Sequence, residues 1–259
     1  MSFGDLAADP HRDAAYRLRA YGLAEKLRQM MLEIATEPDA MRLIAETGHA
    51  VADMHIGLAD REGDPTDLGL PEDIRFTLVL RTHREPVAAF SSKTQFQEDE
   101  RSNMAIILNF LPLDARQAAT SRHGRRLLQK YLAGLFQTHR DVIVHEVIHM
   151  FDYLRGNKTF EKEAAYSRAT GAQYRVLYFN APEEFNALFQ QAVVQIENIL
   201  RRASPGARNR ILKTFEGFSQ AAEALPILIE MRRSMLPWWE KKLDVRLWQT
   251  WEYFKENRK

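Results

Sequence analysis

The H-E-x-x-H pattern at residues 145–149 constrains this chain more than any other feature of its sequence. His145 and His149 lie four positions apart in an apolar stretch that suits a buried helix. Residues four apart lie on the same face of an α-helix, so both imidazoles can reach one metal ion. Glu146 follows directly and can reach a water molecule bound to that metal. The pattern therefore predicts a zinc site with two histidine ligands and Glu146 as general base.

The residues on either side favour a helix with the motif at its centre. Asp141 is a candidate N-cap before an apolar run, and Arg155 with Gly156 is typical of a helix end. Asp152 lies three residues past His149 and falls on the same side of the helix. The alternative is a helix whose histidines only pack or form hydrogen bonds, and the spacing alone leaves that alternative open.

A catalytic zinc usually takes three protein ligands and one water, so a third ligand is needed. The chain has no cysteine, which leaves only histidine and carboxylate ligands. Glu184, 35 residues after His149, is the best choice because its neighbours Phe185 and Leu188 should face the core of the next predicted helix. Glu183 is the competitor, about 100° around the same helix.

Two segments together resemble the gluzincin metallopeptidases of the anthrax lethal factor and MtfA type. They are His145-Glu146-Val147-Ile148-His149-Met150-Phe151-Asp152 and Pro182-Glu183-Glu184-Phe185-Asn186-Ala187, in a region of about 50 residues. The family combines H-E-x-x-H-x-x-D with a later helix that reads roughly (P)-x-E-F-x-A. The resemblance implies one zinc ion per chain on His145, His149 and Glu184, with Glu146 as base. Asp152 would then orient a ligand histidine or brace the motif helix.

The family also has a tyrosine seven residues before the ligand glutamate, available to the substrate oxyanion. This chain has Leu177 at that position and Tyr178 one residue later. We expect Tyr178 to serve in this role, with Tyr174 and Tyr166 as the alternatives.

Hydrophobic patterning predicts an α+β fold that is mostly helical, with a small, mainly antiparallel sheet. The order of strands, one helix and then the motif helix resembles a zincin catalytic domain, so a zincin-like core is expected around this sheet. Three regions are expected: an N-terminal helical region (residues 1–57), the catalytic core (58–203) and a basic, Trp-rich helical region (204–259) packed on the core. Strands are predicted at residues 74–80, 87–96 and 104–110. Helices are predicted at residues 13–36, 38–54, 121–137, around the motif, from the Asn180 cap to 202, and at 208–220 and 221–235. Either of the last two strands could be the sheet edge that pairs with an extended substrate.

Charge is unevenly spread along the chain. Residues 1–100 carry 11 basic and 19 acidic side chains, and residues 201–259 carry 13 basic and 7 acidic ones, although the whole chain has a net charge of +1. Solvated helix faces are the common cause of such a bias, so we predict no nucleic-acid partner. A protein partner could use the C-terminal third, although its four tryptophans are expected to pack the last helix onto the body.

The N-terminus has no basic segment followed by an apolar run, and no stretch approaches the roughly 20 apolar residues of a membrane span. We therefore expect a cytoplasmic protein without a membrane partner, while delivery by a route that needs no signal stays open. The function expected is zinc-dependent hydrolysis of peptide bonds in a protein or peptide. The alternative is a zincin-fold module that serves a larger assembly without turnover.

Overall fold

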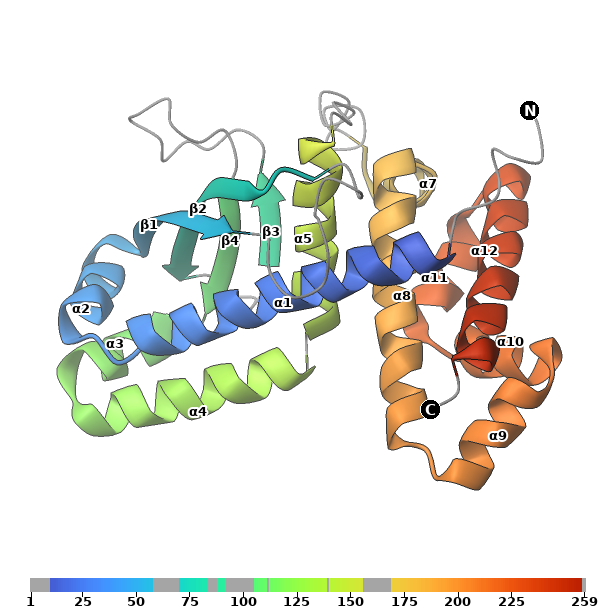
Figure 1. Ribbon diagram of the computed structural model, residues 1–259. Coiled ribbons are helices and arrows are strands. Elements are labelled where there is room, and N and C mark those ends of the chain that lie inside the picture. The colour runs from blue at the N-terminus through green and yellow to red at the C-terminus, as the bar shows by residue number, and fades with distance from the viewer. Residues whose placement is uncertain are drawn as a thin grey trace. The chain divides into compact units, whose positions relative to one another are not determined.

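Helices make up most of the chain, and one small sheet lies in its first half (Figure 1). The computed structural model describes residues 10–57, 70–82, 88–91, 105–110, 112–138, 140–155 and 169–257. The chain divides into an αβ unit, Leu18–Gly156, and a helical unit, Met1–Arg17 with Asn157–Lys259. The predicted mostly helical α+β composition is confirmed. The zincin-like core and the divisions near residues 57 and 203 stay predictions.

The αβ unit places four strands among helices. Its strands are β1 (His49–Gly57), β2 (Asp73–Thr82), β3 (Ala88–Ser91) and β4 (Ala105–Phe110). Its helices are most of α1 (Pro10–Ile34), α2 (Pro38–Thr47), α3 (Pro112–Thr120), α4 (Arg122–Thr138) and α5 (Arg140–Leu154). Helix α3 has no counterpart among the predicted elements; it begins at Pro112, and proline is favoured in the first turn of a helix.

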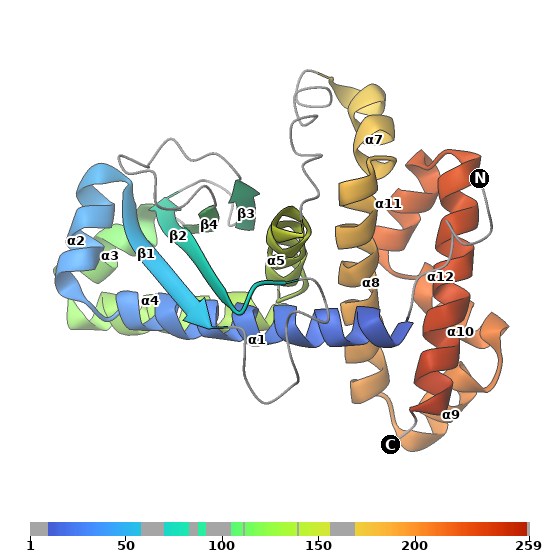
Figure 2. The ribbon, with the colours of Figure 1, turned by 45° about the horizontal axis from the view of Figure 1, so that its top comes forward.

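The sheet is mixed, with strand order β1-β2-β4-β3. The β1–β2 and β3–β4 pairs are antiparallel, as predicted for the sheet as a whole, but β2 and β4 are parallel. The prediction assumed that consecutive strands are neighbours, whereas β4 inserts between β2 and β3. Strand β3 is therefore an edge and β4 is central. Both views place β3 beside α5, the helix that carries the motif (Figures 1 and 2).

Strand β1 corrects the predicted helix over residues 38–54. Helix α2 ends at Thr47 because Gly48 adopts a left-handed conformation, with φ of 82°, and donates its N–H to the carbonyl of Ile44. Glycine adopts this conformation without steric cost, so it is a common helix stop. The chain then runs directly into β1, where His49 pairs with Arg81. In β1 every second residue, Val51, Asp53 and His55, is exposed, and this period of two is the sequence signal of a strand.

The helical unit contains six helices among its described residues. They are α7 (Gly171–Phe179), α8 (Pro182–Arg202), α9 (Pro205–Lys213), α10 (Phe215–Glu223), α11 (Pro226–Ser234) and α12 (Pro237–Glu256). Four of them begin with proline. Proline has no backbone N–H, and it fits the first turn of a helix because the N–H groups there have no acceptor within the helix. The predicted helices at 208–220 and 221–235 are wrong in their bounds. Thr214 caps α10 by accepting a hydrogen bond from the Gly217 N–H, and α11 begins at Pro226. No helix in the described ranges has the length and apolar character needed to cross a membrane.

Tryptophans of α12 pack this last helix onto the unit, as predicted. The Trp239 ring lies 4.9 Å from the Phe185 ring, centroid to centroid, and Trp251 Nε1 donates to the Leu212 carbonyl oxygen at 3.1 Å. Trp248 differs, since 45% of its surface is exposed.

Two buried arginines fasten the first turns of α1 to this unit. Arg17 donates to Gln190 Oε1 at 2.9 Å and pairs with Glu197 at 3.2 Å. Arg246 pairs with Asp13 and lies 4.2 Å from the centre of the Phe189 ring. These contacts connect α1, α8 and α12 through charge as well as through apolar packing.

Candidate metal centre

The two motif histidines lie one helical turn apart on α5. Their Nε2 atoms are 2.9 Å apart, and each residue is only 5% exposed. Tetrahedral zinc with Zn–N bonds near 2.05 Å would hold two ligand nitrogens about 3.3 Å apart. The pair therefore has close to the separation that a shared metal ion requires.

Helix α5 is buried along most of its length, which fixes the direction of both rings. Val144, Val147 and Ile148 are fully buried between and beside the histidines. The helix begins at Arg140, so Asp141 lies in its first turn rather than at the predicted N-cap. A carboxylate there still interacts favourably with the positive end of the helix dipole.

The other two acidic residues of α5 lie on either side of the second histidine. Glu146 is half-buried, so its carboxylate can exchange with solvent while remaining partly enclosed. Asp152 is 3% exposed and its Oδ1 lies 3.9 Å from Arg155 Nη1. This ion pair fits the predicted bracing role at the end of the motif helix.

Glu184 occupies the first turn of α8, where a negative charge is favoured by the helix dipole. It is 5% exposed, and its neighbours Phe185, Ala187 and Leu188 are all buried. The prediction that this face of the helix turns to the core is confirmed. The side chain of its competitor Glu183 lies outside the described residues.

Asn180 holds the start of α8 in a way that the sequence did not predict. The N-cap position belongs to Ala181, which has no side-chain cap. Asn180 instead donates to the carbonyls of Val176 at 2.6 Å and Ser234 at 2.8 Å, and accepts from the Leu236 N–H at 2.7 Å. These bonds fix the turn between α7 and α8.

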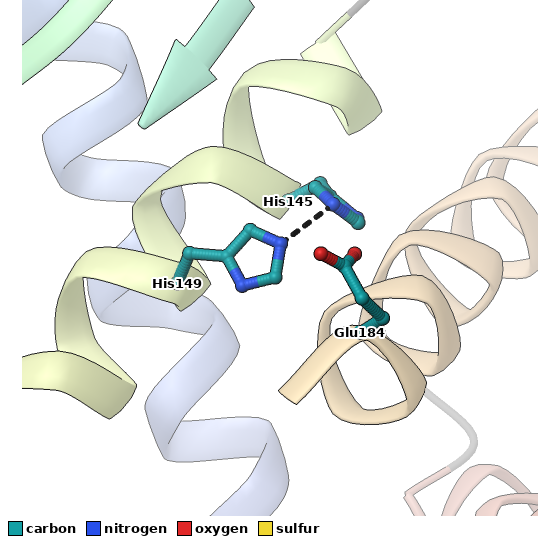
Figure 3. A group of neighbouring side chains, drawn as sticks. All are labelled: His145, His149 and Glu184. Atoms are coloured by element: carbon teal, nitrogen blue, oxygen red, sulfur yellow. Dashed lines mark hydrogen bonds between the residues drawn. The ribbon is translucent and has the colours of Figure 1, made fainter. Parts of the chain in front are cut away.

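Figure 3 shows the side chains of His145, His149 and Glu184 as neighbours. The candidate ligand atoms of the three residues all lie within 4.8 Å of one another. No other group of three or more histidine or acidic side chains with this spacing occurs in the described part of the chain. Two imidazole nitrogens and one carboxylate oxygen form a donor set that catalytic zinc uses, whereas calcium and magnesium prefer oxygen alone.

The tyrosines nearest to Glu184 in sequence lie on α7, a helix that the sequence prediction missed. Tyr174 and Tyr178 stack with their ring centroids 5.5 Å apart. Burial raises the pKa of the Tyr174 phenol, and the charge of Glu184 raises it further. The four-residue spacing of the two tyrosines was the signal that could have found this pair. Tyr166, the third alternative, lies outside the described residues.

Comparisons of this chain with protein-family models, curated proteins and solved structures give no match.

Proposed function

We propose that this chain is a zinc-dependent metallopeptidase. His145, His149 and Glu184 would hold the metal, and Glu146 would act as the general base. The observation that carries the proposal is the spacing of three buried ligand atoms, all within 4.8 Å of one another, from residues up to 39 positions apart in sequence. The burial of Glu184 beside two buried histidines supports a metal site, because burying a carboxylate is costly unless it is paired or bound to a metal.

Each residue has a distinct part in the proposed hydrolysis. Bound zinc supplies a Lewis acid that lowers the pKa of a water molecule and polarises the peptide carbonyl. Glu146 takes a proton from the attacking water as its oxygen bonds to the carbonyl carbon. Glu146 then gives this proton to the leaving amine as the C–N bond breaks. A tyrosine hydroxyl donates a hydrogen bond to the developing oxyanion.

The oxyanion donor in this proposal comes from α7. Tyr178 is the choice made from the sequence. The sensitivity of the Tyr174 phenol to the Glu184 charge supports Tyr174 as the competitor. A tyrosine phenol is protonated at neutral pH, which is the state that can donate a hydrogen bond.

The proposed substrate is a protein or peptide in extended conformation. Strand β3 supports this because it is an edge strand beside the motif helix. The open side of an edge strand can pair with a further strand, which aligns a peptide backbone.

Metal content of two neighbouring variants tests the proposal. We expect about one zinc per chain in the wild type and in Glu183→Ala, and a loss of zinc in Glu184→Ala, measured by elemental analysis after dialysis. The paired variants differ by one position, so they separate ligand loss from a general effect on the first turn of α8. Unchanged zinc in Glu184→Ala would refute the ligand set. Zinc binding without hydrolysis of a denatured protein mixture would instead favour a non-catalytic module.

A further inference from the structure

The end of α8 and the whole of α9 form a stretch without acidic residues. No Asp or Glu occurs between Glu197 and Glu216, whereas five cations do: Arg201, Arg202, Arg208, Arg210 and Lys213. In both views α8 turns directly into α9 (Figures 1 and 2). Helix α9 has nine residues and so spans about 13 Å.

Four of these cations are exposed and are named here the basic corner: Arg201, Arg202, Arg210 and Lys213. None of the four makes an ion pair or a hydrogen bond through its side chain with any residue that the structure describes. Their positive charges therefore face solvent without a described carboxylate at ion-pair distance, although Glu197 lies one helical turn before Arg201 on α8.

Two arginines elsewhere in the helical unit form ion pairs with acidic residues. Arg232 pairs with Glu223 at 2.9 Å and also with Asp244, while Arg233 pairs with Glu230 at 3.2 Å. Lys241 is exposed like the basic corner, but it has the acidic residues Glu240 and Asp244 close by in its own helix. Arg232 and Arg233 are thus compensated by ion pairs, whereas the four cations of the basic corner form none with the described residues.

Helix dipoles explain only part of this pattern. Arg201 and Arg202 lie in the last turn of α8, and Arg210 and Lys213 in the last turn of α9, where a cation gains about 0.3–1 kcal/mol. That gain favours cations at each helix end, but it does not disfavour acidic residues in the first turn of α9. The first turn of α9 is where an acidic residue would be stabilised most, and it has none.

The fifth cation joins the two helices that carry the basic corner. Arg208 donates from Nε to the Leu200 carbonyl at 2.9 Å, which joins α9 to the end of α8. Ser204 caps α9 by accepting the Ala207 N–H at 3.3 Å. Leu212 is buried and its carbonyl accepts from Trp251. These contacts order the backbone that carries the four cations, which lowers the entropy lost on binding.

We propose that the basic corner binds an acidic segment of a partner protein. The exposed face of α9 is formed by Pro205, Gly206, Asn209, Arg210 and Lys213, and no large apolar side chain is exposed between residues 199 and 214. The surface therefore has nothing to insert into a bilayer and no ring on which a base could stack.

The size of the basic corner favours a short acidic segment as its partner. A segment of about the length of α9 interacts mainly with the corner, because charges are screened beyond about 8 Å at physiological salt. Arginine, which supplies three of the four cations, forms planar paired hydrogen bonds with carboxylates.

Fluorescence anisotropy with a labelled 12-residue peptide of alternating Glu and Gly tests this proposal. We expect the full-length protein to bind it at 50 mM NaCl, to lose binding as salt rises, and to ignore a Gln/Gly peptide. The Arg201→Gln/Arg202→Gln and Arg210→Gln/Lys213→Gln variants should each weaken binding about fivefold, since exposed ion pairs contribute up to about 1 kcal/mol each. Lys213→Gln should weaken binding about twofold or more, whereas Lys241→Gln removes the same charge from the same unit and should change nothing.

Three results would overturn the proposal. The first is no binding of the acidic peptide by the wild type at 50 mM NaCl. The second is an equal loss in Lys213→Gln and Lys241→Gln, which would mean that only total charge matters. The third is tighter binding of a 12-base-pair DNA duplex that the same variants weaken, which would assign the corner to nucleic acid. None of these results depends on metal content or on hydrolysis.

Discussion

The histidine pair on α5 and the glutamate on α8 are fixed by different kinds of structure. His145 and His149 are placed by one turn of helix, since any residues four apart on an α-helix lie on one face. Glu184 is placed by the start of α8, by the turn that Asn180 fixes, and by the buried side chains around Phe185. One half of the candidate centre is therefore local, and the other half depends on tertiary packing.

This difference predicts how substitutions act in the two regions. A change in the chemistry of α5 that leaves its apolar side chains alone should alter the site without altering stability. A change around Glu184 in α8 should alter both, because packing of the core also sets the position of the carboxylate. Each prediction below tests one side of this difference.

The largest effect is expected from Glu146→Gln on α5. The substitution removes a proton acceptor but keeps nearly the same shape, so we expect hydrolysis to fall about 100- to 10,000-fold while zinc content and melting temperature stay unchanged. Hydrolysis of a denatured, labelled protein, with elemental analysis of the same sample, measures both. Normal turnover by this variant would remove Glu146 from the role of base.

Substitution of one buried phenylalanine in each region tests the two kinds of structure directly. Phe151 on α5 is 0% exposed and Phe185 on α8 is 1% exposed, so replacing either by alanine should cost about 3–5 kcal/mol of unfolding free energy. All four tryptophans follow residue 236, in the helical unit. In urea, Phe185→Ala should therefore shift the tryptophan fluorescence transition more than Phe151→Ala does. Equal shifts would show that the two units unfold as one.

The same contrast explains what the sequence could predict. The existence and approximate extent of the motif helix and of α8 follow from local signals, such as Pro182 and the periodic apolar residues, although their N-cap residues differ from those predicted. The pairing of β2 with β4 does not, because the order of strands in a sheet depends on contacts between distant segments. Helix α7 escaped prediction because seven of its nine residues are exposed, so it lacks the apolar stripe that reveals an amphipathic helix. The sequence favours Glu184 over Glu183 as the ligand only because the apolar neighbours Phe185 and Leu188 indicate which face of the helix is buried.

Substitution of the proposed oxyanion donor tests the half of the candidate centre that depends on α8, because the Asn180 turn joins α7 to α8. We expect Tyr178→Phe to lower the hydrolysis rate about 100- to 1,000-fold with zinc retained, the usual loss of one such donor. Tyr174→Phe is the matched control on the same helix face, and should leave the rate within about tenfold. A larger loss of rate in Tyr174→Phe than in Tyr178→Phe would identify Tyr174, whose pKa is raised by burial and by the Glu184 charge, as the oxyanion donor.

The smallest effect on stability is expected in α1. This helix carries a buried arginine ion pair in the helical unit and a partly exposed one in the αβ unit. In the helical unit Arg17 is 3% exposed and pairs with Glu197, whereas in the αβ unit Arg28 donates from Nε to both carboxylate oxygens of Glu25 at 2.8 and 2.9 Å near the surface. The Arg28 hydrogen bond lowers the pKa of Glu25, partial burial opposes this, and the charges of Arg28 and Arg140 add to the lowering. Both Arg28 and Glu25 are about a third or more exposed, so solvent screening limits the pair to a few tenths of a kcal/mol.

The direction of the pH dependence follows from that lowered pKa. A depressed carboxyl pKa stabilises the folded state fully above the ordinary value of 4.5, and this contribution is lost as the pH falls through the lower, folded value. Glu25→Gln should therefore be about 0.3 kcal/mol less stable than the wild type at pH 7, and this difference should shrink at pH 3, as measured by urea unfolding at both pH values. A difference in unfolding free energy that persists at pH 3 would mean that Glu25 acts through packing rather than through its charge. The Glu25–Arg28 pair would then resemble the buried Arg17–Glu197 pair despite its greater exposure.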